Sequence, residues 1–128
     1  MGRILLIDDD QVFTSFLADY ISENYPLLKV EICNNPVSAL HSIKAGGYAL
    51  MLIDLEMPAM DGLKLLKFAV ETGMDKNRIV ILSGRDADFL HSLCPMGTCL
   101  AVLNKFEARQ KSVLDMVFKS LSRKAGGG

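Results

Sequence analysis

The chain has 128 residues, of which 50% are hydrophobic and 23% are charged. This composition is typical of one folded domain with its own core, and it excludes a disordered or fibrous chain. The formal net charge of −1 provides no broad basic surface for a nucleic-acid backbone, so we expect no direct nucleic acid binding. The apolar run near the amino terminus is too short for a signal peptide or a membrane span.

The sequence contains three cysteines, Cys33, Cys94 and Cys99. An odd number without a CxxC pair, and without histidines at zinc-ligand intervals, fits neither a disulfide framework nor a structural zinc site. Free thiols of this kind are typical of a reducing compartment. We therefore expect a cytoplasmic protein that makes no contact with a membrane.

Short apolar runs and segments with helical periodicity alternate along the chain. Most of these apolar runs are continuously hydrophobic, which is typical of parallel strands covered on both faces. In chain order, the predicted elements are a strand at 4–7, a helix at 11–24, a strand at 29–32, a helix at 36–45, a strand at 49–53, a helix at 62–72, a strand at 78–82, a weaker helix at 86–93, a strand at 100–103 and a helix at 107–122.

Local signals support several of these boundaries. Asn35 followed by Pro36 is typical of a helix start, Gly46 and Gly47 end the same helix, and Asp61 before Gly62 suits another start. The first and last helices carry apolar stripes that we expect to face the core. These stripes are Phe13, Phe16, Leu17, Tyr20 and Ile21 on the first helix, and Val113, Leu114, Val117 and Leu121 on the last.

Strands that alternate with helices predict a doubly wound α/β domain, a parallel sheet of five strands with helices on both faces. We expect this domain to span residues 1–124, and the glycine-rich residues 125–128 to form a flexible tail or the start of a linker. In open sheets of this class, ligands bind at the carboxyl ends of the strands.

Polar side chains follow four of the predicted strands at the point where each strand ends. Because the carboxyl ends of parallel strands meet at one edge, we expect these side chains to lie close together. In the common strand order 2-1-3-4-5 the first and third strands are neighbours, and their carboxylates converge. The residues are Asp8, Asp9 and Asp10 after the first strand, Asp54 after the third, Ser83 after the fourth, and Asn104 and Lys105 after the fifth.

The carboxylates of Asp8, Asp9 and Asp54 would repel one another unless a cation neutralised them. Mg²⁺ suits an open acidic pocket, because it binds one or two carboxylates, several water molecules and phosphate oxygens. Lys105 adds a positive charge and Ser83 adds a hydroxyl donor for a phosphoryl group. Together these groups predict a site at which a carboxylate attacks phosphorus and becomes an aspartyl phosphate.

Four segments of the sequence resemble the response-regulator receiver domains of two-component signal transduction. They are ILLIDDD at 4–10, MLIDLEMPAMDG at 51–62, ILSG at 81–84 and VLNKF at 102–106, in the order and at the spacing of that family. The likeness covers essentially the whole chain, and the DxxMPxMDG segment is its most specific part. It implies a flavodoxin-like (βα)₅ domain with strand order 2-1-3-4-5, and a signalling switch rather than an enzyme that turns over metabolites.

By this resemblance, Asp54 is the phosphoryl acceptor, and Ser83 and Lys105 hold the phosphoryl group. Asp54, Asp9, Asp8 partly through water, and the backbone carbonyl of Glu56 bind Mg²⁺. The phosphoryl donor is a phosphohistidine on a sensor histidine kinase or a phosphotransfer protein, and small phosphodonors are expected to substitute. Phosphorylation changes the surface of the fourth helix, fifth strand and fifth helix, which a downstream output domain or protein partner recognises.

Two residues depart from the family pattern. Phe106 stands where the family usually has proline after the active-site lysine, joined by a cis bond. A cis bond before a non-proline residue costs about 2.5 to 4 kcal/mol, so we expect the Lys105 loop to be trans or strained. Val102 stands where the family commonly has Tyr or Phe, so the signal is expected to pass through the loop after Ser83 instead.

Glu56 and Arg85 carry opposite charges two residues after Asp54 and two residues after Ser83. We expect them to form an ion pair over the mouth of the pocket. Such a pair would hinder the water molecule that hydrolyses an acyl phosphate.

The sequence leaves two other functions open. A receiver-like interaction module that signals without phosphorylation would keep the fold and the acidic pocket, and Phe106 and Val102 favour it. A small aspartate-nucleophile phosphatase would need an aspartate two residues after its nucleophile, where Glu56 stands, and a segment that caps its substrate. The sequence also leaves open whether two copies pair as a homodimer through the fourth and fifth helices, and whether an output domain follows residue 128.

Overall fold

The computed structural model describes residues 2–58, 60–85, 87–95, 97–105 and 108–127. Its strands are β1 (Gly2–Ile7), β2 (Leu28–Cys33), β3 (Leu50–Asp54), β4 (Glu56–Met57), β5 (Met60–Asp61), β6 (Ile79–Ser83) and β7 (Ala101–Asn104). Its helices are α1 (Gln11–Asn24), α2 (Pro36–Ala45), α3 (Gly62–Glu71), α4 (Ala87–Leu93) and α5 (Ala108–Gly127), with a 3-10 turn η1 (Lys76–Arg78).

The main sheet has five parallel strands in the order β2-β1-β3-β6-β7. This confirms the predicted doubly wound sheet and its order 2-1-3-4-5. The register places Asp54 opposite Leu82 and Ser83 opposite Asn104. The strands therefore end at one common edge, where the polar residues that follow them come together.

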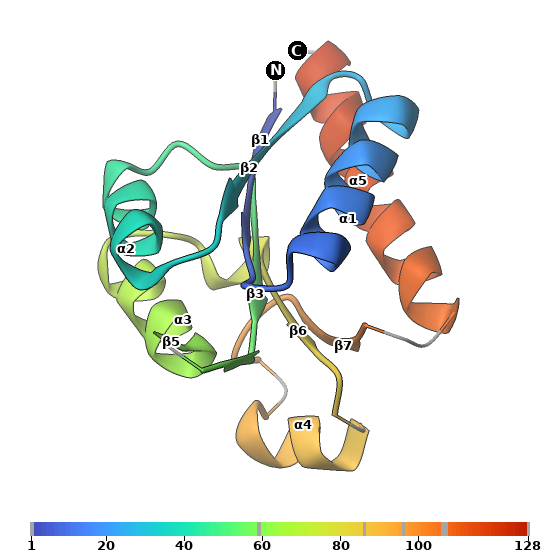
Figure 1. The fold of residues 1–128 in the computed structure, drawn as a ribbon. Coiled ribbons are helices and arrows are strands. Elements are labelled where there is room, and N and C mark those ends of the chain that lie inside the picture. The colour runs from blue at the N-terminus through green and yellow to red at the C-terminus, as the bar shows by residue number, and fades with distance from the viewer. Residues whose placement is uncertain (1, 59, 86, 96, 106–107, 128) are drawn as a thin grey trace.

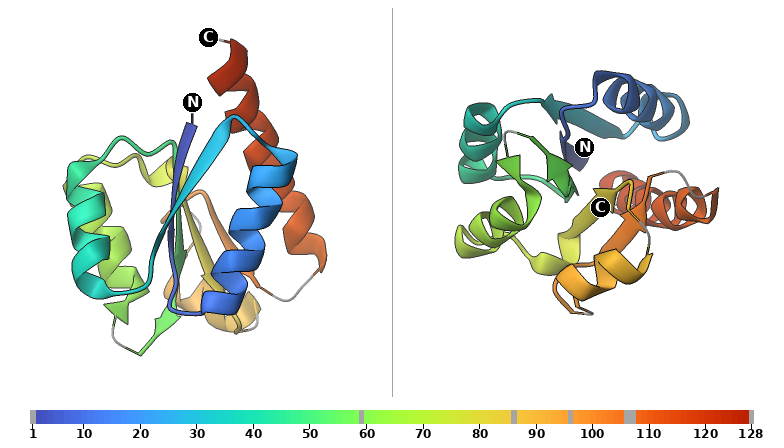
Figure 2. Two further views of the ribbon diagram at one scale, coloured as in Figure 1. Left: turned by 45° about the horizontal axis from the view of Figure 1, so that its top comes forward. Right: turned by 60° about the horizontal axis from the view of Figure 1, so that its bottom comes forward.

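Helices cover both faces of this sheet, with α1 and α5 on one face and α2 and α3 on the other (Figures 1 and 2). A cluster of buried apolar side chains fills each of the two layers. Strand β3 serves both layers, because its successive side chains point to opposite faces. Met51 and Ile53 enter one cluster, whereas Leu50 and Leu52 enter the other. This burial on both faces accounts for the continuously apolar strands.

The predicted caps fix the starts of two helices. Asn35 accepts a hydrogen bond from the backbone N–H of Ser38 at 2.9 Å and caps α2. Asp61 accepts one from the N–H of Leu63 at 2.9 Å and caps α3. Gly46 ends α2 with a φ of 71°, a conformation that favours glycine. These turns set the loops that connect the helices to the sheet.

The segment between β3 and α3 differs from the prediction, which had no element there. It forms the small antiparallel hairpin of β4 and β5, in which Glu56 lies opposite Asp61. A pairing this short leaves no periodic pattern in the sequence, because it contributes only two residues from each strand. The hairpin directs the chain away from β3 immediately after Asp54.

The end of α5 also differs from the prediction. The helix continues to Gly127, whereas the sequence predicts a flexible tail from residue 125. A methyl group placed on Gly126 would lie 2.8 Å from Leu27 Cδ1, so the last turn of the helix lies directly against Leu27. Packing against this side chain outweighs the low helix propensity of glycine.

The apolar stripe predicted for α1 is only partly buried. Leu17 and Ile21 lie in the core, four residues apart on one face of the helix. Phe16 is 70% exposed, so its prediction as a core residue is wrong, and Val12 on the same side of the helix is 82% exposed. On α5, Leu114 is buried as predicted, and Phe118 adds a fully buried side chain that the predicted stripe did not include.

Gly62 allows the start of α3 to approach the end of β3. A Cβ atom at this position would lie 2.5 Å from the carbonyl oxygen of Asp54 and 2.8 Å from Leu55 Cα. Both neighbours are backbone atoms, so neither can move aside by a change of rotamer. The hydrogen of Gly62 is therefore required for the backbone of Asp54 to lie where it does.

We predict that Gly62→Ala lowers the free energy of unfolding by about 1 to 3 kcal/mol, because the added methyl group overpacks the end of β3. The matched control is Gly126→Ala, whose methyl group meets only the flexible end of the Leu27 side chain. Urea unfolding measures both effects. Equal stabilities of the two variants would contradict this role of Gly62.

Candidate functional site

The ends of the strands bring the predicted site residues together. Asp8 follows β1, Asp54 ends β3 and Ser83 ends β6, and all three are buried. Asp9 is exposed at the rim. Lys105 follows β7, and its backbone N–H donates to the carbonyl oxygen of Ser83 at 2.8 Å. This hydrogen bond continues the pairing of β7 with β6 and fixes the lysine beside the carboxylates.

Lys105 bridges the two buried carboxylates. Its Nζ lies 2.6 Å from Asp8 Oδ2 and 3.4 Å from Asp54 Oδ2, and its side chain is only 8% exposed. The same ammonium group lies 4.7 Å from the centre of the Phe13 ring, a cation–π contact. The sequence predicts Phe13 as a core residue only, because its contact with Lys105 depends on how distant segments pack.

Burial, and next the neighbouring Asp8 carboxylate, raise the pKa of Asp54 from 3.8 to about 7, although Lys105 opposes this rise. Burial alone would lower the pKa of Lys105, but its contacts with Asp8 and Asp54 outweigh burial and raise that pKa. Lys105 therefore stays charged at neutral pH, whereas Asp54 gains and loses its proton near neutral pH. A divalent cation would favour the ionised carboxylate.

The three carboxylates predicted as metal ligands form a compact group. One oxygen atom from each of Asp8, Asp9 and Asp54 lies within 4.8 Å of the others. Asp8 Oδ2 is buried and, beyond its ion pair with Lys105, has no hydrogen-bond partner among the described residues. Carboxylate oxygens grouped in this way, with Asp9 exposed at the rim, fit Mg²⁺ with water completing its shell. The N–H of Glu56 donates to Asp54 Oδ1 at 3.2 Å, so the backbone of Glu56 lies beside this group.

The side chains around Ser83 make contacts that the sequence did not predict. Ser83 Oγ donates to Glu56 Oε1 and accepts a hydrogen bond from the N–H of Arg85 at 3.0 Å. The Arg85 guanidinium lies 3.8 Å from the centre of the Phe89 ring. Within the described residues no ion pair joins Glu56 to Arg85, so that prediction is wrong. The Ser83 hydroxyl engages the glutamate, and the arginine stacks on α4 instead.

Neighbouring groups orient the acidic run after β1. Asp8 Oδ1 accepts the N–H of Asp10 at 3.0 Å, and the side-chain amide of Asn34 donates to the Asp8 carbonyl at 2.8 Å. The Asp10 carboxylate caps α1 by accepting the N–H of Phe13. Asp8 and Asp9 thus join the acidic group, whereas Asp10 starts a helix. The sequence did not lead us to predict Asn34 as a site residue. Its position directly after β2, at the same sheet edge as the other polar residues, could have identified it.

Of the two residues that depart from the family pattern, Phe106 and Val102, the structure describes only Val102. Phe106, on which the predicted geometry of the Lys105 loop rests, is outside the described residues. Val102 on β7 is half-buried and packs against the apolar cluster under α2 and α3. The route of the signal through the loop after Ser83 stays a prediction.

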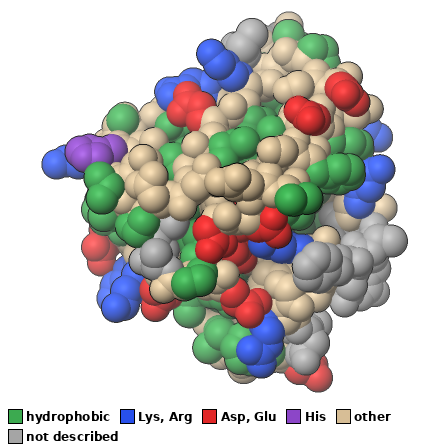
Figure 3. All heavy atoms as spheres, in the orientation of Figure 1, with side chains coloured by type: hydrophobic (Ala, Val, Ile, Leu, Met, Phe, Trp, Pro, Cys, Tyr) green, Lys and Arg blue, Asp and Glu red, His purple; other side chains and the backbone are tan. Residues whose placement is uncertain are grey.

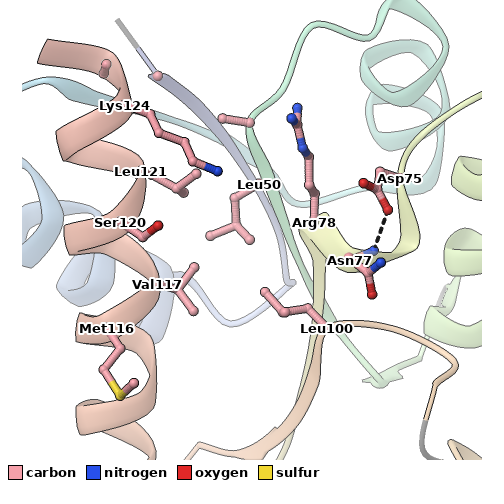
Figure 4. Close-up of a pocket in the computed structure, with 13 residues that line it drawn as sticks. Leu50, Asp75, Asn77, Arg78, Leu100, Met116, Val117, Ser120, Leu121 and Lys124 are labelled. Carbon is pink, nitrogen blue, oxygen red and sulfur yellow. Dashed lines mark hydrogen bonds between the residues drawn. The ribbon is translucent and has the colours of Figure 1, made fainter. Parts of the chain in front are cut away.

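Figure 3 shows Asp and Glu side chains gathered beside Lys or Arg side chains in the lower half of the face seen in Figure 1. A groove of about 770 Å³ lies at the opposite end of the sheet, between α5 and the amino-terminal ends of the strands (Figure 4). Leu50, Arg78, Leu100 and Lys124 contribute to its lining, which includes none of the clustered carboxylates. We therefore place the functional site at the acidic end.

A family model, the response regulator receiver domain, matches residues 4–111. This span contains Asp8, Asp9, Asp54, Ser83 and Lys105. The chain belongs to this family. Receiver domains are the signalling domains of two-component response regulators, and they bind Mg²⁺ at an acidic pocket.

Curated relatives agree with this assignment. Response regulator MprA of Mycobacterium leprae (strain TN) is 33% identical over 85 residues, which are 66% of this chain and 36% of the relative. The cyclic di-GMP phosphodiesterase response regulator RpfG of Xanthomonas campestris pv. campestris (strain 8004) is 36% identical over 65 residues, 51% of this chain and 17% of the relative. The chain thus spans about a third or less of these relatives, and the activity in the second name belongs to that protein.

Solved structures share the fold. Response regulator TrrA of Thermotoga maritima, in complex with Mg²⁺-BeF, is 22% identical, with a TM-score of 0.74 over 94% of this chain and 99% of that chain. A two-component response regulator from Clostridium difficile is 19% identical, with a TM-score of 0.79 over 98% of this chain and 99% of that chain. Within the described ranges, none of the helices has the length and hydrophobicity needed to cross a membrane.

We predict that Asp54→Asn stabilises the metal-free receiver domain more at about pH 8 than at about pH 4.5. The pKa of Asp54 is raised from 3.8 to about 7, so the folded state binds more protons than the unfolded state between these values. The stability of the wild type then falls as the pH rises through this window. The gain from Asn should differ by about 1 to 3 kcal/mol between the two pH values.

Urea unfolding with a chelator present measures this difference, and saturating Mg²⁺ should reduce it by stabilising the ionised carboxylate. An equal effect of the substitution at both pH values would show that the Asp54 carboxylate is not crowded in the folded protein.

Proposed function

We propose that this receiver domain is a phosphorylation-dependent switch in which Asp54 accepts a phosphoryl group while Mg²⁺ is bound. The observation that carries this proposal is the position of Asp54, buried at a strand end with Lys105 Nζ at 3.4 Å and within a compact group of three carboxylates. A nucleophile, a cation site and a fixed positive charge are the groups that phosphoryl transfer needs.

In the proposed reaction, a carboxylate oxygen of Asp54 attacks phosphorus. The bond between phosphorus and the donor histidine nitrogen breaks, and the imidazole leaves with the electron pair. The product is an acyl phosphate on Asp54. Asp8, Asp9, Asp54 and the backbone carbonyl of Glu56 would hold Mg²⁺, and the ion would neutralise charge on the transferred group.

Lys105 and Ser83 would hold the phosphoryl oxygens. Lys105 is already charged and enclosed, so it can exchange part of its contact with Asp8 and Asp54 for a phosphoryl oxygen without leaving the site. Ser83 Oγ lies at the end of β6, and it also accepts the N–H of Arg85. A shift of Ser83 toward the phosphoryl group would therefore move the start of the loop that leads to α4. That loop connects the site to the surface formed by α4, β7 and α5.

Exposed apolar side chains beside the site support a protein as the phosphodonor. Val12 and Phe16 on α1 are 82% and 70% exposed, and α1 begins directly after the acidic run. Exposed apolar residues at such a position are typical of a protein interaction surface. A phosphohistidine carried by a sensor histidine kinase or a phosphotransfer protein fits this surface, and an output domain or protein partner would recognise the switched state.

One observation favours the second candidate, a receiver-like module that signals without phosphorylation. The Ser83 hydroxyl donates its hydrogen bond to Glu56. Glu56 thus takes the place that a phosphoryl oxygen would have as the acceptor. A test for phosphorylation separates the two candidates.

Incubation with acetyl phosphate and Mg²⁺ should add one phosphoryl group to the wild-type protein, detected as a labile adduct by intact-mass measurement. Asp54→Asn should give no adduct, and neither should the wild type after Mg²⁺ is removed with a chelator. If a phosphohistidine donor also leaves the wild type unmodified, the interaction module is the better account. Sustained release of phosphate from small esters would favour the phosphatase.

We further predict that Lys105→Met slows adduct formation by at least about tenfold. The substitution removes a positive charge that stabilises the negative charge developing on the phosphoryl group, and a loss of about 1.4 kcal/mol of such stabilisation slows the reaction tenfold. The matched control is Lys111→Met on α5, because Lys111 contacts the Tyr20 ring and not the carboxylates. The rate is measured with acetyl phosphate at saturating Mg²⁺. Equal rates for the two variants would exclude a role for Lys105 in the transfer.

A further inference from the structure

The Glu56 side chain accepts the only hydrogen bond that the Ser83 hydroxyl can donate. A serine hydroxyl has one proton and can donate it to one acceptor at a time. In this structure that acceptor is Glu56 Oε1, and the oxygen of the same hydroxyl receives the N–H of Arg85. Ser83 is fully buried, so no bulk water competes for this proton. A phosphoryl oxygen on Asp54 would need the proton that the glutamate holds.

Backbone pairing brings Glu56 and Ser83 together. The N–H of Leu55 donates to the carbonyl of Leu82 at 2.8 Å, which aligns the residues that follow Asp54 with the end of β6. The N–H of Glu56 donates to Asp54 Oδ1, and hairpin pairing holds Glu56 opposite Asp61. The contact with Ser83 is therefore supported by the backbone on both sides of it.

We propose that the Glu56 carboxylate is an internal substitute for the phosphoryl group: it holds Ser83 while Asp54 is unmodified and must release it when Asp54 is phosphorylated. This inference rests on the proposed function. It gives Glu56 a role through its side chain, in addition to the backbone carbonyl assigned to the metal. Glu56 is a positioning residue that acts through Ser83.

Two physical effects follow from this arrangement. First, phosphorylation exchanges a charge-assisted hydrogen bond within the protein for one to the phosphoryl group, so part of the gain from that second bond is cancelled. Second, the phosphoryl group adds negative charge beside a carboxylate, and the two groups repel each other. Both effects slow phosphorylation and bias the protein toward the unmodified form.

The test compares the wild type with Glu56→Ala and Glu56→Gln in acetyl phosphate and saturating Mg²⁺, with intact mass as the readout. Glu56→Ala should be phosphorylated at least about fivefold faster, because no hydrogen bond to a charged acceptor has to be given up. Glu56→Gln keeps an acceptor oxygen without the charge, so its rate should lie between the other two. The matched control is Glu71→Ala, an exposed glutamate at the end of α3, which should match the wild type.

A double substitution shows whether the effect passes through Ser83. In the Ser83→Ala background, Glu56→Ala should change the rate less than it does in the wild-type background, since the contested proton is then absent. Adducts that form at equal rates on the wild type and on Glu56→Ala would overturn this inference and leave the proposed function intact. So would an equal effect of Glu56→Ala in both backgrounds. Absence of an adduct on every one of these proteins, with acetyl phosphate and also with a phosphohistidine donor, would instead overturn the proposed function, and this inference with it.

Discussion

The repulsion between buried carboxylates, balanced by a single enclosed lysine, is the interaction on which the site depends. Asp8 and Asp54 lie at the ends of adjacent strands with little exposure to solvent. Two like charges about 4 Å apart cost roughly 4 kcal/mol at the effective dielectric constant near a protein surface. Lys105 offsets this cost through contacts with both groups. The same crowding raises the pKa of Asp54 and makes the site attractive to a divalent cation.

The register of the sheet delivers these groups to one place. Ser83 pairs with Asn104, so the residue after β7 is the lysine that reaches the carboxylates. A shift of β7 by one residue would turn its side chains to the opposite face and remove Lys105 from the site. Gly62 lets α3 begin against the backbone of Asp54. The placement of the acceptor is therefore a property of strand pairing and backbone packing together, and the short hairpin after β3 adds Glu56 to the same pocket.

The sequence predicted the features that follow from periodicity and from strand ends. Continuous apolar runs identified the strands, and the polar residues after them identified Asp8, Asp54, Ser83 and Lys105. Predictions from the sequence failed where contacts between residues far apart in the chain determine the structure. The last turn of α5 depends on contact with Leu27, and no local preference of glycine indicates it. The neighbour chosen by Glu56 is also non-local: simple charge complementarity favours Arg85, whereas the strand ends bring Ser83 closer and Phe89 takes the guanidinium.

The property on which the site depends most is that Asp54 lies in a crowded acidic group, which a divalent cation would stabilise. An NMR titration of the Asp54 side-chain carboxyl carbon, with and without Mg²⁺, tests it most directly. We expect a pKa of about 7 for Asp54 in the metal-free protein and a lower pKa when Mg²⁺ is added. An ordinary aspartate pKa that does not change with Mg²⁺ would contradict it.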